Sequence, residues 1–230
     1  HALSKQPEVE AAVRQVLGRS YFSLGLLSAA QAHLEQAKVL AEQHQFTASE
    51  LYLAILSTLV GLYNDQYKTA EALSVSYQAL GLAEQLYGTG HIKTLGAISD
   101  LASAYHTAGE LVKAEQMWYR LYQQRLTLLG AQHPDIVNSL TNLGIINHWL
   151  GRYDKAEQYY QQCFTTASAL MGLKHPSTLQ CMSVLGSVYE TSGQYSKAEP
   201  LIRRHVALAQ QVLGELHPDT LRSQHNLADS

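Results

Sequence analysis

Apolar residues recur at three- and four-residue intervals along most of the chain, and the segment 134–171 shows the pattern most clearly. Its first half carries an apolar stripe made of Ile136, Leu140, Leu143, Ile146 and Leu150. This spacing is typical of one face of an amphipathic helix. Pro134 suits the first helical position, where no amide hydrogen is needed, and Gly151 suits a C-terminal cap. The pattern predicts a first helix, A, that ends near Gly151 and a second helix, B, that runs to about Met171.

The same pattern returns every 42 residues. The positions that carry the period include four histidines, three of them followed by proline, and a series of leucines each followed by a small residue or valine: His91, His133, His175 and His217; Leu17, Leu59, Leu101, Leu143, Leu185 and Leu227. A fixed period of this length is typical of a solenoid. The sequence therefore predicts a single all-α solenoid over residues 1–230, built from antiparallel helix pairs. Its repeats are approximately 7–48, 49–90, 91–132, 133–174 and 175–216, with a partial repeat at 217–230.

Small residues predict where the two helices of each repeat cross. On helix A these are Gly18, Ala102, Gly144 and Gly186, and we expect them to face Ala30, Ala114, Ala156 and Ala198 on helix B. Helix B also has candidate capping boxes, in which two side chains satisfy each other's free amides. The candidate pairs are Ser28 with Gln31, Asp154 with Glu157, and Ser196 with Glu199.

The second repeat departs from this pattern. It has no glycine at the turn between its helices, and Asp65-Gln66-Tyr67 leads to Ala70-Glu71 two residues early. We expect a tighter turn there, with altered local geometry over residues 63–70.

Composition narrows the range of functions. The formal net charge is -3 and charged residues make up 15% of the chain, so no broad basic surface is available for nucleic acid or acidic lipid. No apolar run is long enough for a membrane span, and the first residues do not resemble a signal peptide. We expect a soluble protein, cytoplasmic by default, although the sequence names no compartment. The abrupt ends at His1 and Ser230 suggest a piece of a longer protein.

Several residue types suggest chemistry that their positions do not favour. The repeated histidines lie at the same corner of successive repeats, so we interpret them as helix caps and expect no metal site.

Cys163 and Cys181 lie on helices expected to pack together, and buried free thiols are favoured over a disulfide. The tyrosines at a shared repeat position, Tyr21, Tyr63, Tyr105 and Tyr189, are interpreted as packing residues. No phosphate-binding loop or nucleophile elbow is present, so we expect neither an enzyme nor a cofactor.

The residues resemble a known family. Leu143-Gly144, Gly151, Tyr153 and Ala156-Glu157 are similar to the tetratricopeptide repeat, and the His-Pro-Asp start with the 42-residue period is similar to the kinesin-light-chain variety. More weakly, the segment 7–14 resembles the start of arrays attached to bacterial serine/threonine kinases and related signalling proteins. A HEAT or armadillo array, the alternative fold, does not explain the recurrent small residues. The resemblance implies a right-handed superhelix in which the A helices line a concave face.

On that basis, the resemblance implies a peptide-binding groove formed by the A helices. Its residues would be Ser99, Asp100, Ser103, His106, Asn138, Thr141, Asn142, Ile145, His148, Trp149, Ser183, Ser187, Glu190, Arg222 and Asn226, with Gln15 and Arg19 at the opposite end. Asn142 and Asn226 share a repeat position, and Asp100 occupies the same position in the third repeat. Trp149 adds an apolar anchor. Alternatively, these side chains only solvate the inner face.

The predicted function is a protein–protein interaction scaffold that binds an extended peptide or a partner helix. The alternative is a structural, self-associating or regulatory module of a larger signalling protein. The partial repeat would leave Leu221 and Leu227 uncovered, and because solenoid ends need capping, a homodimer through that end is one way to cover them.

Overall fold

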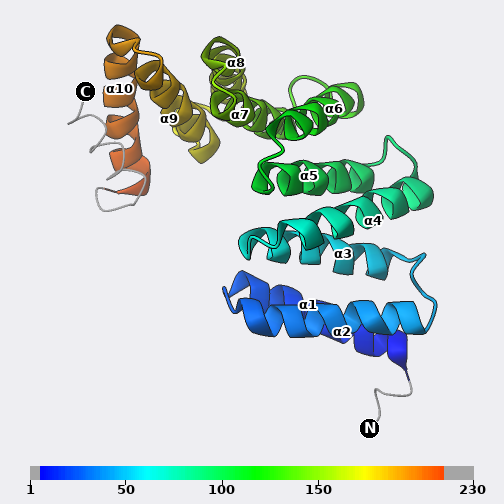
Figure 1. Ribbon diagram of the computed structural model, residues 1–230. Helices are drawn as coiled ribbons and strands as arrows, with labels where there is room; N and C mark the ends of the chain where they lie inside the picture. The colour runs from blue at the N-terminus through cyan, green and yellow to red at the C-terminus, as the bar shows by residue number, and fades with distance from the viewer. Residues whose placement is uncertain (1–5, 215–230) are drawn as a thin grey trace. The chain divides into compact units, whose positions relative to one another are not determined.

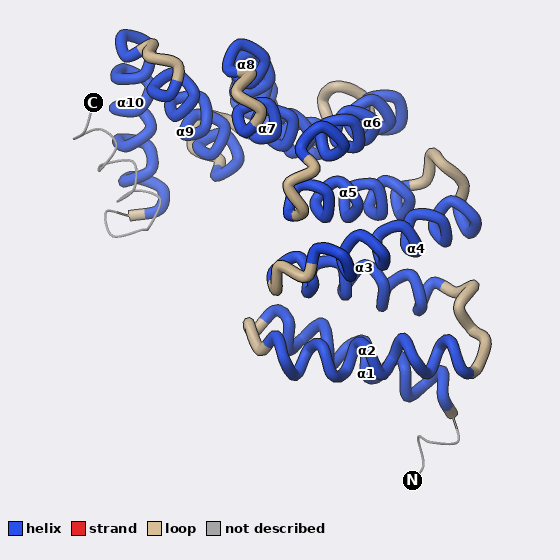
Figure 2. Tube along the Cα trace, viewed as in Figure 1, coloured by secondary structure: helices blue, strands red, loops and turns tan. Residues whose placement is uncertain are grey.

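The computed structural model describes residues 6–214, and these form two compact units, 6–117 and 118–214, with the boundary inside one helix. The described chain contains ten helices and no strand (Figures 1 and 2). The helices of the first unit are α1 (Pro7–Ser23), α2 (Leu27–Gln43), α3 (Glu50–Asp65), α4 (Thr69–Tyr87) and α5 (Ile92–Thr107); α6 (Leu111–Leu129) crosses the boundary; and the second unit continues with α7 (Pro134–Trp149), α8 (Tyr153–Met171), α9 (Pro176–Thr191) and α10 (Tyr195–Leu213). Odd-numbered helices are the predicted A helices and even-numbered helices the B helices. The predicted partial repeat at 217–230 lies outside the described residues.

The A helices begin as the sequence predicts. The ring nitrogen Nδ1 of His91, His133 and His175 accepts a hydrogen bond from the backbone N–H two residues later, at 3.1–3.2 Å. Ser49 caps α3 with its hydroxyl, which accepts from the N–H of Tyr52, three residues later, at 3.1 Å. The capping role assigned to these histidines is confirmed, because each side chain satisfies an amide that the first helical turn leaves free.

The turn between A and B is the same in all five described repeats. One residue in each turn has a positive φ of 56–75°, and the next residue's N–H bonds back to the carbonyl five residues earlier at 2.8–2.9 Å. This is a Schellman motif, which normally favours glycine at the left-handed position. Four repeats have glycine there, whereas the second has Tyr67 at φ 56°. The second repeat therefore keeps the same turn without a glycine, and the altered geometry expected over residues 63–70 is not observed.

The prediction of a tighter turn in the second repeat is wrong, because its turn has the same hydrogen bonds as the other four. The five B helices begin at equal intervals of 42 residues, at Leu27, Thr69, Leu111, Tyr153 and Tyr195. Ala72, rather than Ala70, is the counterpart of Ala30, and both are fully buried. The packing of helix B therefore fixes the register, and Tyr67 adopts the backbone conformation that the turn requires.

The closest approach between helices A and B differs in detail from the prediction. The alanines at the crossing are fully buried, yet the nearest side chain to each glycine comes from the residue four positions after the alanine. A β-carbon added at Gly18 would lie 2.5 Å from Leu34 Cγ, and one added at Gly186 would lie 2.8 Å from Ile202 Cγ1. A β-carbon at Gly144 would overlap the ring of Tyr160. Glycine therefore makes room for a large side chain of helix B.

The predicted capping boxes are wrong. α8 starts at Tyr153, so Asp154 lies within its first turn, and the flanking residue Arg152 makes no side-chain cap. Glu157 instead bonds to the next repeat, accepting from Gln194 Nε2 at 3.0 Å and pairing with Lys197 Nζ at 3.4 Å.

The first repeat shows the same arrangement. Gln31, the counterpart of Glu157, accepts from Gln66 Nε2 at 3.0 Å and from Lys68 Nζ at 2.9 Å. These side chains therefore join neighbouring repeats rather than cap their own helix.

The tyrosines at the shared position pack as predicted. Tyr63, Tyr105 and Tyr189 are 7%, 8% and 8% exposed. Their hydroxyls bond to the preceding B helix: Tyr63 donates to Glu35 at 2.9 Å, Tyr105 pairs with the Tyr77 hydroxyl, and Tyr189 bonds to Glu157. The packing interpretation is therefore confirmed for these three.

The preference for free thiols is wrong in this structure. Cys163 on α8 and Cys181 on α9 form a disulfide, with their Cα atoms 5.7 Å apart. Both residues are buried within the cluster that also contains Ile136, Val137 and Leu140. The turn between α8 and α9 brings the two side chains together, which the sequence separation alone did not reveal.

Candidate functional site

The predicted groove residues lie on A helices, and the two units hold them separately. α1 contacts α3 and α3 contacts α5 in residues 6–117, while α7 contacts α9 in residues 118–214. Each unit therefore has an A-helix face built from adjacent helices. Arg222 and Asn226 lie outside the described residues.

The face of the first unit is centred on Asp100. Its half-buried carboxylate accepts a hydrogen bond from Ser57 of α3, and burial raises its pKa from 3.8 to about 6 despite that bond. Ser99, Ser103 and His106 are also half-buried on α5. This face therefore carries serine hydroxyls and one acid whose pKa of about 6 lies close to neutral pH.

The face of the second unit includes an exposed aromatic side chain. Trp149, the last residue of α7, is 69% exposed. Asn138 is exposed and Asn142 half-buried on the same helix. An amide can both donate and accept hydrogen bonds, as the backbone of a peptide requires. All three side chains are therefore at least partly accessible to a ligand.

Two other predicted residues of α7 serve packing. Thr141 is 7% exposed, and its hydroxyl bonds to the Val137 carbonyl at 2.9 Å and lies 3.1 Å from Cys163 Sγ. Ile145 packs against the buried cluster that contains Tyr160 and Leu185. Their positions on the A helix matched the groove pattern, but their side chains turn toward the core.

His148 lies between core and surface. Its ring meets that of Tyr153 edge-on, with centroids 5.4 Å apart, and burial lowers its pKa. The imidazole is therefore predominantly neutral at pH 7, so it adds no positive charge beside Trp149.

The remaining predicted residues extend the two faces. Ser183, Ser187 and Glu190 are half-buried along α9. At the start of the first unit Arg19 is exposed, whereas Gln15 is 8% exposed and belongs to the packed interior.

Within residues 6–214, no three histidine, cysteine or acidic side chains converge in a way that could hold a metal ion. None of the described helices is long and apolar enough to cross a membrane.

The sequence interpretation missed two hollows beside the B helices. One, of about 250 Å³, lies between α6 and α8 and includes Tyr122 and Leu126; the other, of about 360 Å³, lies between α8 and α10. The second could have been found from the sequence, because Lys197, Pro200, Leu201 and Arg204 follow the i, i+3, i+4, i+7 pattern of a single helix face.

Comparison with known families agrees with this architecture. Two tetratricopeptide-repeat families match, one at residues 94–167 and 135–211 and the other at residues 53–93. The chain therefore belongs to the tetratricopeptide-repeat family and forms an all-α helical-repeat solenoid. No curated protein matches the sequence.

Solved structures share the fold at low sequence identity. The nearly identical TPR-like repeats from a putative kinesin light chain of Podosopora anserina are 21% identical, with a TM-score of 0.76, covering 86% of this chain and 94% of that one. BtubC (BKLC) from P. vanneervenii is 18% identical, with a TM-score of 0.65 and coverage of 93% and 94%. A Rap protein complexed with competence and sporulation factor is 17% identical, with a TM-score of 0.64 and coverage of 92% and 62%. All three share the fold, and the first supports the kinesin-light-chain-like repeat type predicted from the sequence.

Proposed function

We propose that the chain is a non-catalytic protein-interaction scaffold that binds an extended peptide or a partner helix on its A-helix face. The observation that carries this proposal is Trp149, which is 69% exposed and shares α7 with Asn138 and Asn142. Tryptophan is enriched among the residues that dominate binding energy, and most of this large ring faces solvent instead of the core. The Rap protein bound to competence and sporulation factor offers a precedent within this fold.

The chemistry of the face favours a peptide main chain. Asn138 and Asn142 supply amides, Ser183 and Ser187 supply hydroxyls, and the neutral His148 adds no net charge. Such groups recognise the repeating N–H and C=O of any extended segment, while the indole selects an apolar side chain.

The test is selection of peptides from a random display library on the purified chain, followed by affinity measurements on variants. We expect Trp149→Ala to weaken the selected peptides by about 30-fold, equivalent to a loss of about 2 kcal/mol, and Asn142→Ala to weaken them less. Tyr195→Ala is the matched control, because Tyr195 is 60% exposed on a B helix. Peptides that bind the Trp149 and Asn142 variants as tightly as the unaltered chain would refute the proposal.

A second candidate function is self-association through an end of the array. The predicted C-terminal contact lies outside the described residues, but α1 has an exposed apolar stripe, in which Val9, Val13 and Val16 are 45%, 41% and 50% exposed. Sedimentation velocity of the chain and its Val13→Glu variant tests this alternative. A concentration-dependent dimer that the substitution abolishes would support it, and a strict monomer would exclude it.

A further inference from the structure

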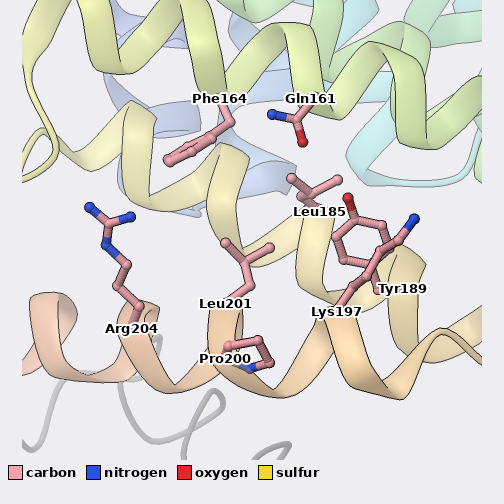
Figure 3. Close-up of a pocket in the computed structure, with 8 residues that line it drawn as sticks. All are labelled: Gln161, Phe164, Leu185, Tyr189, Lys197, Pro200, Leu201 and Arg204. Atoms are coloured by element: carbon pink, nitrogen blue, oxygen red, sulfur yellow. The ribbon is translucent and has the colours of Figure 1, made fainter.

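The hollow between α8 and α10 has the composition of a binding site. Figure 3 shows Leu185 and Tyr189 of α9 between the two B helices, with Phe164 of α8 on one side and Leu201 of α10 on the other. Its volume of about 360 Å³ falls within the 300–1,000 Å³ or so typical of ligand sites. It lies beside B helices and shares no residue with the proposed A-helix face.

The walls of this hollow are held in place. Leu185 and Tyr189 belong to the buried core cluster, at 2% and 8% exposure, and Leu201 packs against the same cluster. Pro200 contributes a ring without the rotamer freedom of a long side chain. An apolar group entering here would meet a surface that needs little further ordering, which favours binding.

The charges around the hollow are not balanced. Lys197 pairs with Glu157 at 3.4 Å and lies 5.2 Å from the centre of the Tyr189 ring. Arg203, outside the hollow, pairs with Glu199 at 2.8 Å. Arg204 lines the hollow, and the structure gives it no ion pair within residues 6–214.

The position of Arg204 indicates what would complement it. In Figure 3 Arg204 lies toward Phe164, while Lys197 lies toward Tyr189. A guanidinium that lines the same hollow as an aromatic ring and an apolar floor suits a carboxylate joined to an apolar body, because arginine binds carboxylates through two parallel hydrogen bonds.

We propose that this hollow, the outer site, binds a segment of a protein partner that carries a large apolar side chain next to a carboxylate. The apolar side chain lies over Leu185 and Leu201, and the carboxylate pairs with Arg204. The array then has two recognition surfaces, one on the A helices for peptide backbone and one on the B helices for an acidic, apolar motif.

The test is an NMR titration of the isotope-labelled chain with two dipeptides, acetyl-Phe-Glu-amide and its neutral isostere acetyl-Phe-Gln-amide. We expect the glutamate peptide to bind about five-fold more tightly, with chemical-shift changes centred on Phe164, Leu201 and Arg204. Arg204→Gln should reduce that ratio to below about two-fold. Arg203→Gln is the matched control on the same helix and should leave the ratio unchanged.

Acetyl-Ala-Glu-amide tests the apolar half of the site, and we expect it to bind at least about five-fold more weakly than the phenylalanine peptide. The proposal is overturned by equal affinity for the glutamate and glutamine peptides, by equal affinity for the alanine and phenylalanine peptides, or by equal effects of Arg203→Gln and Arg204→Gln. Trp149→Ala should not alter this binding, so failure here and failure of the A-helix face are distinguishable.

Discussion

Replacing Gly144 by alanine tests how closely helices A and B approach. The added β-carbon would lie 2.8 Å from Tyr160 Cζ and nearer still to two other ring carbons. Tyr160 is 2% exposed, so its ring cannot move into solvent. Overpacking costs about 1–3 kcal/mol, and the tight contact with a buried ring places Gly144→Ala at the upper end. Alanine regains about 1 kcal/mol of helix propensity, so we expect a net loss of about 2 kcal/mol.

Urea unfolding followed by circular dichroism measures this loss, and two other helical glycines provide the control. A β-carbon added at Gly81 or Gly96 would have no neighbour within 4 Å, so each Gly→Ala change should stabilise the chain by about 0.5–1 kcal/mol. In a Tyr160→Ala background the obstacle is gone, and Gly144→Ala should then behave like these controls. If Gly144→Ala costs the same with or without the tyrosine ring, the reasoning is refuted.

Three further predictions concern local features. Tyr67→Gly should stabilise the chain by about 0.5–1 kcal/mol in urea unfolding, because it relieves the left-handed strain at φ 56° but adds freedom to the unfolded chain; a destabilised variant would contradict this. Asp100→Asn should raise the free energy of unfolding at pH 7 by about 1–2 kcal/mol. The pKa of Asp100 is about 6 in the folded chain against 3.8 in the unfolded chain, so the folded chain takes up the proton first as the pH falls. The stability advantage of the asparagine variant should therefore disappear between about pH 7 and pH 4. An advantage that does not change with pH would exclude the raised pKa of Asp100. Cys163→Ala should lower the free energy of unfolding by about 3 kcal/mol, because it opens a loop of 18 residues. Alkylation of the unaltered chain, followed by mass spectrometry, should modify neither cysteine until the chain is both unfolded and reduced. Rapid labelling of the native chain would show free thiols.

The repeat itself was predictable because its signals are local. The apolar stripe of α7, the glycine in four of the five turns and the capping histidines each report one backbone requirement that nearby residues satisfy. The 42-residue register then follows, since every B helix must bury the same alanine position.

The errors arose where a distant residue decided the outcome. Glu157 fits a capping box by spacing, but Gln194 and Lys197 of the next repeat bind its carboxylate. The disulfide depends on how α8 packs on α9, which a separation of 18 residues does not specify.

The candidate site was only partly accessible from sequence for a related reason. The repeat pattern places Thr141 and Ile145 on the expected helix, but only the packing shows that these side chains serve the core. The outer site was only partly visible in the sequence. The spacing on α10 marks one wall of it, but Phe164, Leu185 and Tyr189 come from two other helices, and only the packing brings them to that wall.

The bonds that Gln31 and Glu157 receive from the following repeat have a consequence for how the array can be rearranged. Gln31 accepts hydrogen bonds from Gln66 and Lys68. Glu157 accepts from Gln194, which occupies the repeat position of Lys68, and from Lys197, three residues further along the chain. These two junctions thus have different donor and acceptor sets, even though the helices share one period. Exchanging the helix pairs at these two junctions would keep the buried alanine of each helix B but mismatch the polar contacts, so which repeat follows which is partly encoded in these side chains.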